Sequence, residues 1–175
     1  MKSRVFYCCR ARRSTRESGF TLMELLIVMA IITCIILIAI PTTSSIFKHA
    51  HELSAKRSLQ TIQQAEILYN DTFTANGYAC KLTDLGGDAS TGQPTPTSAQ
   101  ILKSDLSSGL KDGYIFTITN CTKSTINGIE RANGFEVTAV PEAVGKTGDR
   151  GFCLDQYGNM KSDPAGGSNC TQPIN

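Results

Sequence analysis

The sequence predicts an α+β fold in which one long N-terminal helix packs against a small antiparallel β-sheet. Three observations support this prediction. An apolar run reaches from Phe20 to Pro41, a stretch without Gly or Pro continues from residue 42 to residue 73, and segments rich in β-branched and aromatic residues follow residue 113. A sheet that covers an amphipathic helix face is the expected two-layer arrangement.

The first 19 residues form a basic leader. They contain six Lys or Arg residues and one Glu, a net charge of +5, so the rest of the chain carries −3 of the total of +2. A basic block before an apolar segment predicts a cytoplasmic N-terminus, with the rest of the chain across the membrane. A nucleic-acid-binding arm is the competing interpretation, and the apolar segment that follows directly disfavours it.

Residues 20 to 41 are predicted to form a transmembrane helix. Residues 25 to 40 contain no charge, and Thr33 is their only clearly polar residue. As a helix, residues 20 to 40 would span about 32 Å, close to the bilayer hydrocarbon core of about 30 Å. Glu24 interrupts this pattern. A carboxylate in an apolar segment costs up to about 3 kcal/mol at the bilayer centre and usually marks a functional site, the alternative being an interfacial Glu24 that reaches the headgroups.

A cleavable secretory signal is disfavoured, and a retained anchor is favoured. A secretory signal carries a small-residue cleavage site after its apolar region. Here Ile40 is followed by Pro41-Thr42-Thr43-Ser44, which has no such pattern.

The junction Gly19-Phe20-Thr21-Leu22-Met23-Glu24-Leu25 closely resembles the class III signal of type IV prepilins and pseudopilins. The resemblance implies that prepilin peptidase removes residues 1 to 19 by cutting between Gly19 and Phe20, and that it then N-methylates Phe20. It also implies that Glu24 meets the terminal amine of a neighbouring subunit during assembly. Such a partner suits a carboxylate in lipid, because half of a buried ion pair is strongly unfavourable.

Pro41 ends the apolar run and predicts a kink, because proline removes a backbone hydrogen bond from a helix. Beyond it, residues 42 to 77 are predicted to form the amphipathic second half of the helix, ended by Asn76-Gly77. The predicted stripe recurs at three- and four-residue steps, first along Ile46, Ala50, Leu53 and Arg57 and then along Leu59, Ile62, Ala65, Tyr69 and Phe73. One helix from Phe20 to Thr74 would measure about 80 Å.

Residues 78 to 175 are predicted to be an exported region of loops and a β-sheet. An exposed loop is expected at 86 to 100 and a short helix at 101 to 106. Strands are predicted at 113–119, 135–141 and 151–155, with a turn at 157–159 and a short fourth strand near Met160. Short connections between successive strands favour antiparallel pairing.

Four of the seven cysteines lie in this region, at Cys80, Cys121, Cys153 and Cys170. Outside the inner membrane they are expected to form disulfides, for which three pairings are open. We favour Cys80 with Cys121, which would tie the loop after the helix to the end of the first strand, and Cys153 with Cys170, which would close the polar tail. Cys34 is interpreted as a small apolar contact between helices.

Neither a catalytic site nor a metal site is predicted. The sequence contains no Gly-rich phosphate loop, His-Glu-x-x-His, Gly-x-Ser-x-Gly or Cys-x-x-Cys, and its two histidines are expected to be solvated. Asp149, Asp155 and Asp163 lack the spacing of a calcium loop and are expected in turns. The chain is therefore predicted to be no enzyme and to need no cofactor.

The resemblance implies a structural subunit of a type IV pilus filament that serves adhesion, motility or DNA uptake. The subunit would wait in the bacterial inner membrane as a single-pass protein, then join a periplasmic or cell-surface filament. Its partners would be other subunits, prepilin peptidase, the inner-membrane assembly platform and membrane lipid, with no nucleic acid unless the pilus takes up DNA. The alternatives are a major pseudopilin-like subunit of a type II secretion system and a membrane-tethered ligand-binding domain.

Overall fold

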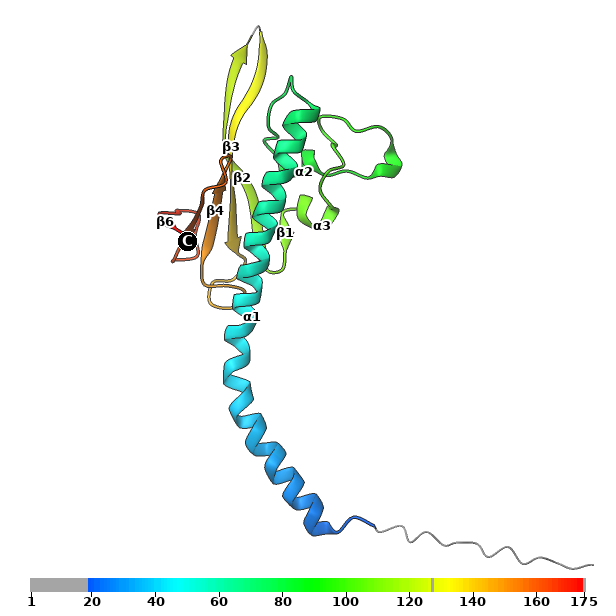
Figure 1. The fold of residues 1–175 in the computed structure, drawn as a ribbon, viewed down its shortest axis with the longest axis vertical. Helices are drawn as coiled ribbons and strands as arrows, with labels where there is room; N and C mark the ends of the chain where they lie inside the picture. Colours follow the sequence, from blue (N-terminus) through cyan, green and yellow to red (C-terminus); the bar gives the residue numbers. More distant parts are fainter. Residues whose placement is uncertain (1–18, 127, 175) are drawn as a thin grey trace, which may run out of the picture. The chain divides into compact units, whose positions relative to one another are not determined.

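The computed structural model describes residues 19 to 126 and 128 to 174, without the side chains of residues 38 to 43, 91 and 126. The predicted α+β class is confirmed, because helix α1, Leu22–Thr72, is followed by a six-stranded antiparallel sheet (Figure 1). The chain divides after Pro41 into two compact units, and α1 contributes residues to both.

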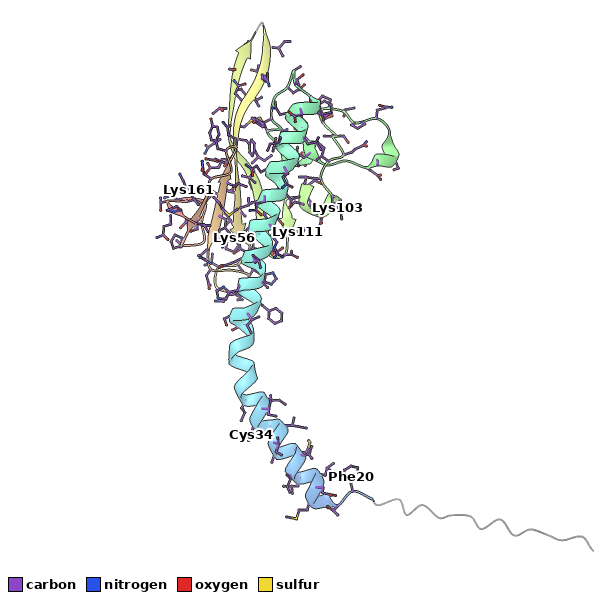
Figure 2. All side chains as sticks on the ribbon, in the orientation of Figure 1. Phe20, Cys34, Lys56, Lys103, Lys111 and Lys161 are labelled. Atoms are coloured by element: carbon purple, nitrogen blue, oxygen red, sulfur yellow. A yellow bond between two sulfur atoms is a disulfide. The ribbon has the colours of Figure 1, made fainter. Side chains whose placement is uncertain are left out.

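In the first unit, α1 buries none of its described side chains. Every described side chain from Phe20 to Leu37 is exposed, and even Ile32, the least exposed large apolar residue of this stretch, is 44% exposed (Figure 2). A helix that is apolar all round is normally buried in a protein or a membrane. This part of α1 therefore presents apolar surface that the described residues do not cover.

In the second unit, one face of α1 packs against the sheet. Its buried apolar residues recur at three- and four-residue steps and are Ala55, Leu59, Ile62, Ala65 and Tyr69. The first part of the predicted stripe was wrong, since Ile46 is 63% exposed and Leu53 is 49% exposed. At about 100° per residue, Leu53 lies on the side of the helix opposite to Ala55, so the two halves of the stripe belong to different faces.

The sheet is an antiparallel meander whose strands follow one another in sequence order. The strands are β1 Leu110–Lys111, β2 Tyr114–Ile126, β3 Ile129–Pro141, β4 Gly151–Asp155, β5 Met160–Asp163 and β6 Gln172–Pro173. Phe116, Val137, Phe152 and Leu154 are buried in the core that the sheet shares with α1. The predicted strands at 151–155 and near Met160 correspond to β4 and β5.

Strands β2 and β3 extend further than the sequence analysis predicted, to 13 residues each. They pair from Tyr114 with Pro141 to Ile126 with Ile129, and the register is irregular between Thr119 and Lys123. The added residues are mostly polar and lack apolar alternation, so the strand pattern fades there. The missed signal was Asn127-Gly128, since Asn-Gly between two β-branched residues is typical of a hairpin turn.

Three short helices follow α1 in the sequence and precede the first strand: α2 Leu82–Leu85, η1 Ala89–Thr91 and α3 Ser104–Ser107. The predicted helix at 101 to 106 corresponds to the shorter α3. The loop before it is held by backbone hydrogen bonds, among them Ala99 N–H to the Asp84 carbonyl at 2.8 Å and Gln100 N–H to the Gly86 carbonyl at 2.7 Å.

Candidate functional site at the N-terminal junction

Gly19 and Phe20 lie before α1 in backbone that is not helical. Phe20 is 90% exposed. Apart from its chain neighbours, no atom of the described residues lies within 4 Å of where a Cβ on Gly19 would stand. The described part of the chain therefore leaves this backbone open to an external partner, and its packing does not require glycine at position 19.

Thr21 and Glu24 form a reciprocal capping box at the start of α1. The Glu24 N–H donates to Thr21 Oγ1 at 3.2 Å. In return, Glu24 Oε2 accepts hydrogen bonds from the Thr21 N–H at 2.9 Å and from the Thr21 hydroxyl at 3.0 Å. Since Leu22 is the first helical residue, Thr21 is the N-cap and Glu24 the third residue of the helix. The pair fixes where the helix begins.

Thr21 is a residue that the sequence analysis missed, although Thr-x-x-Glu before an apolar run is the signature of this box. The box gives Glu24 a local role that was not predicted. It occupies Oε2, and among the described residues no hydrogen bond reaches Glu24 Oε1. The carboxylate can therefore hold the helix start with one oxygen and accept a further partner with the other.

Thr33, in the middle of the apolar stretch, needs no hydrogen-bond partner outside the helix. The Thr33 hydroxyl donates to the Met29 carbonyl at 2.7 Å, which satisfies it within the helix. Cys34 is an exposed free thiol. Glu24 is thus the charged group of this stretch whose hydrogen bonding is incomplete.

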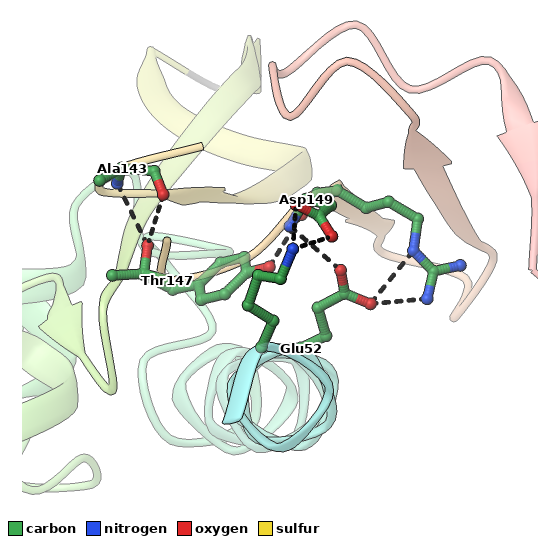
Figure 3. A network of polar contacts seen from close by, with 7 residues as sticks. Glu52, Ala143, Thr147 and Asp149 are labelled. Carbon is green, nitrogen blue, oxygen red and sulfur yellow. Dashed lines mark hydrogen bonds and ion pairs between the residues drawn. The ribbon is translucent and has the colours of Figure 1, made fainter. Parts of the chain in front are cut away.

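Further along α1, charged side chains tie the helix to the segment that precedes β4 (Figure 3). Glu52 is 4% exposed and accepts hydrogen bonds from Arg150 Nη2 at 2.6 Å and from the Asp149 N–H at 3.2 Å. Lys48 Nζ lies 2.9 Å from Asp149 Oδ2. Burial opposes ionisation of Glu52, but the hydrogen bonds and the charge of Arg150 outweigh it and lower the pKa of Glu52. This cluster of charged side chains anchors the segment before β4 to helix α1.

Glu66 is a fully buried carboxyl group on the packed face of α1. Glu66 Oε2 accepts a hydrogen bond from the Ala79 N–H at 2.8 Å, and Glu66 Oε1 has no hydrogen-bond partner among the described residues. Burial raises the pKa of Glu66 to about 8; the Ala79 hydrogen bond opposes this rise, and the charge of Asp84 adds to it. Glu66 therefore carries a proton at neutral pH.

Two disulfides brace the second unit, Cys80–Cys121 and Cys153–Cys170, with Cα–Cα distances of 5.6 Å and 6.0 Å. These are the pairings favoured from the sequence. The first joins the loop after α1 to β2, and Ala79, the partner of Glu66, directly precedes it.

Residues 14 to 40 match the family model of the prokaryotic N-terminal methylation motif. The matched segment contains Gly19, Phe20, Thr21 and Glu24 together with the apolar run. The chain carries the type IV prepilin/pseudopilin signature. Comparisons with curated proteins and with solved structures gave no match.

The prepilin signature supports a pilin- or pseudopilin-like subunit. It implies processing by prepilin peptidase and assembly into a pilin polymer, and it fits an N-terminal hydrophobic anchor in the membrane. The residues that the structure describes include no helix that is both long and apolar enough to cross a membrane.

Several predictions about this junction remain predictions. Leader residues 1 to 18 lie outside the described residues. Cleavage between Gly19 and Phe20, methylation of Phe20 and the assembly contact of Glu24 each await a biochemical test. Pro41 lies within α1, one residue past the matched segment, and its side chain is outside the described part. The kink expected at Pro41 is equally untested.

Proposed function

We propose that the chain is a structural subunit of a type IV pilus filament, with no catalytic activity of its own. Prepilin peptidase cleaves between Gly19 and Phe20 and methylates the new amino terminus. The mature subunit waits in the inner membrane, and the assembly platform draws it into a helical polymer. The observation that carries this proposal is the prepilin signature on a helix whose first part, from Leu22 to Leu37, exposes all of its side chains.

Glu24 guides assembly in this proposal. In the free subunit Thr21 holds Glu24 Oε2, as the capping box shows. In the filament, the methylated amine of a neighbouring subunit pairs with the remaining oxygen. Opposite charges attract far more strongly in an apolar medium than in water, and either charge left alone there is costly. The pairing therefore favours one axial register between neighbours.

Glu24 variants test this role, provided that the charge of Glu24 is separated from its capping function. Glu24→Gln removes the charge but keeps an acceptor at the third helical position, where Gln also forms capping boxes. Thr21→Ala is the matched control, because it removes the capping hydroxyl, at a cost of about 1 kcal/mol, and keeps the charge. We expect the Glu24→Gln chain to be cleaved but to stay in the membrane, so that sheared filaments do not contain it. The Thr21→Ala chain is expected to assemble.

Cleavage is measured first in each variant, by the mass of the mature chain. Normal filaments from Glu24→Gln would refute the assembly role of Glu24. A cleaved Thr21→Ala chain that fails as completely as Glu24→Gln would show that capping, and not charge, is what assembly requires.

A pseudopilin of type II secretion shares the prepilin signature and is the second candidate. The two disulfides of the second unit suit both candidates, because disulfides persist in the periplasm as well as outside the cell. Cells that lack the chain distinguish the two, since a pilus subunit is needed for surface filaments and a pseudopilin for secretion. A membrane-tethered ligand-binding domain would function normally with Glu24→Gln.

A further inference from the structure

We propose that the buried carboxyl group of Glu66 positions Cys80 for its disulfide with Cys121, and that the proton on Glu66 and the disulfide stabilise one another. Both act on the strap, residues 76 to 80, which lies between α1 and α2 in the sequence. All of these residues belong to the second unit, and their coupling does not require a filament.

Strand β3 holds the first part of the strap. The Ala132 N–H donates to the Asn76 carbonyl at 2.9 Å, and the Tyr78 N–H donates to the Ala132 carbonyl at 3.0 Å. Gly77 lies between these two bonds, too close to the Ala132 carbonyl for any side chain to fit. The Tyr78 ring meets the Phe135 ring edge-on, with their centres 4.9 Å apart. These contacts fix residues 76 to 78 against the sheet.

Glu66 holds the next residue of the strap against α1. Glu66 is 0% exposed and Ala79 is 2% exposed, and Glu66 Oε2 accepts a hydrogen bond from the Ala79 N–H at 2.8 Å. Glu66 Oε1 has no partner among the described residues, so a single hydrogen bond would compensate a negative charge here. A buried charge with so little compensation is costly. The strap in this closed position therefore favours a proton on Glu66.

The groups around Glu66 favour the proton as well. Burial is the main cause that raises the pKa of Glu66 to about 8, and the charge of Asp84, from α2, adds to the rise. The hydroxyl of Tyr69, on α1, donates to the Pro96 carbonyl at 2.8 Å. The other charged side chains that line the hollows beside the strap are Lys81, Lys123 and Glu130, of which Lys123 and Glu130 pair at 3.6 Å. Among the described residues, no cation forms an ion pair with Glu66.

The disulfide closes the strap one residue further on. Cys121 lies in the irregular part of β2, where the pairing with β3 shifts register, and such a bulge redirects a side chain. The bond joins Cys121 to Cys80, which directly follows Ala79, across a Cα–Cα distance of 5.6 Å. The Glu66 hydrogen bond and the disulfide therefore hold adjacent residues of the strap.

Because these two contacts hold adjacent residues, each affects the other. With the disulfide intact, the strap stays closed and Glu66 keeps its proton. Once the disulfide is reduced, the strap can open and admit water to Glu66, whose ordinary pKa is 4.5. Linkage is reciprocal, so a disulfide that favours the proton is itself favoured by the proton, by the same factor. The disulfide therefore becomes easier to reduce as the pH rises from 4.5 to about 8.

Equilibration of the detergent-solubilised full-length chain with reduced and oxidised glutathione tests this coupling. One glutathione thiol attacks a disulfide sulfur and releases the other cysteine, and a second glutathione thiol then releases the first cysteine. The protein gains two electrons and two protons, and one oxidised glutathione forms. Alkylation and mass spectrometry measure the oxidised and reduced forms of each cysteine pair. Cys153–Cys170 is the internal reference, because it contains no strap residue and reports the pH dependence of glutathione itself.

We expect the oxidised-to-reduced ratio of Cys80–Cys121, relative to that of Cys153–Cys170, to fall between pH 6 and pH 9. The fall reaches about 100-fold if reduction opens the strap fully. Glu66→Gln is the matched control, because its side chain stays neutral at every pH and can still accept the Ala79 hydrogen bond. A fall of less than about twofold in the natural chain, or an equal fall in Glu66→Gln, overturns the proposal.

Hydrogen exchange distinguishes opening of the strap from unfolding of the whole unit. In Cys80→Ser/Cys121→Ser, the Ala79 amide is expected to lose protection between pH 6 and pH 8, beyond the rise that base catalysis causes, while the amides of β4 keep theirs. In Cys153→Ser/Cys170→Ser, the Ala79 amide is expected to stay protected. An Ala79 amide whose protection does not change with pH in the first variant, or changes only together with β4, contradicts the coupling.

Discussion

At the scale of one residue, Glu24 uses one carboxylate oxygen to cap the helix and leaves the other free for a further hydrogen bond or ion pair. Its Oε2 is engaged by the Thr21 N–H and hydroxyl, and its Oε1 accepts no hydrogen bond among the described residues. The carboxylate is thereby oriented before a partner arrives, which lowers the entropy lost on pairing. Local capping and assembly are compatible roles of one side chain.

A prediction at the scale of one residue concerns Glu66 and pH. Because its pKa rises from 4.5 to about 8 on folding, the native state keeps a proton that the unfolded chain releases. Stability from this group is complete below pH 4.5 and falls by about 1.4 kcal/mol per pH unit until about pH 8. Glu66→Gln should therefore flatten the decline, and at pH 9 it should unfold at a higher temperature than the natural chain.

Thermal unfolding of the detergent-solubilised chain at pH 6 and pH 9 measures this effect. Glu52→Gln is the control, because the pKa of Glu52 is lowered on folding and its stabilisation is lost on acidification instead. If the unfolding temperature of Glu66→Gln falls as much between pH 6 and pH 9 as that of the natural chain, another group causes the alkaline loss of stability.

At the scale of elements, the sequence predicted the long helix closely, from Phe20 to Thr74 against Leu22–Thr72. The helical period and the Gly stop are local signals that predicted the extent of this helix, and the Thr21 N-cap is a local signal that was missed. The choice of buried face was less predictable. Leu53 and Ala55 both suit a core, and only the position of the sheet decides that Ala55 is inside.

The sheet was predicted where apolar alternation is strong, and missed where pairing depends on tertiary contacts. β1 and β6 have two residues each, too few for any periodicity. The outer half of the β2–β3 ribbon is polar and relies on its turn and on backbone pairing. Glu66 was overlooked for the same reason, because nothing in Gln63-Gln64-Ala65-Glu66 shows that Ala79 folds back over it.

The disulfides provide a prediction for these connecting elements. In the chain-entropy model, the pairs separated by 41 and 17 residues contribute about 4 and about 3 kcal/mol respectively. Replacing Cys80 and Cys121 by Ser should therefore lower the unfolding midpoint more than replacing Cys153 and Cys170. Thermal unfolding of the two double variants, with and without reductant, checks the order. Equal midpoints for both variants and the natural chain would contradict it.

At the scale of the whole molecule, the two units have different requirements. The second unit has its own core, two disulfides and an ion-pair cluster that ties the segment before β4 to α1. The first unit presents exposed apolar side chains over its described length. In the proposed filament, a membrane or other subunits cover that surface, so the proposal accounts for both units.

The intact mass of the mature chain tests the central claim most directly. We expect a chain that begins at Phe20, carries one methyl group on its amino terminus and contains two disulfides. A chain that begins at Met1, or one that begins beyond Ile40, would contradict processing as a prepilin and with it the proposed filament.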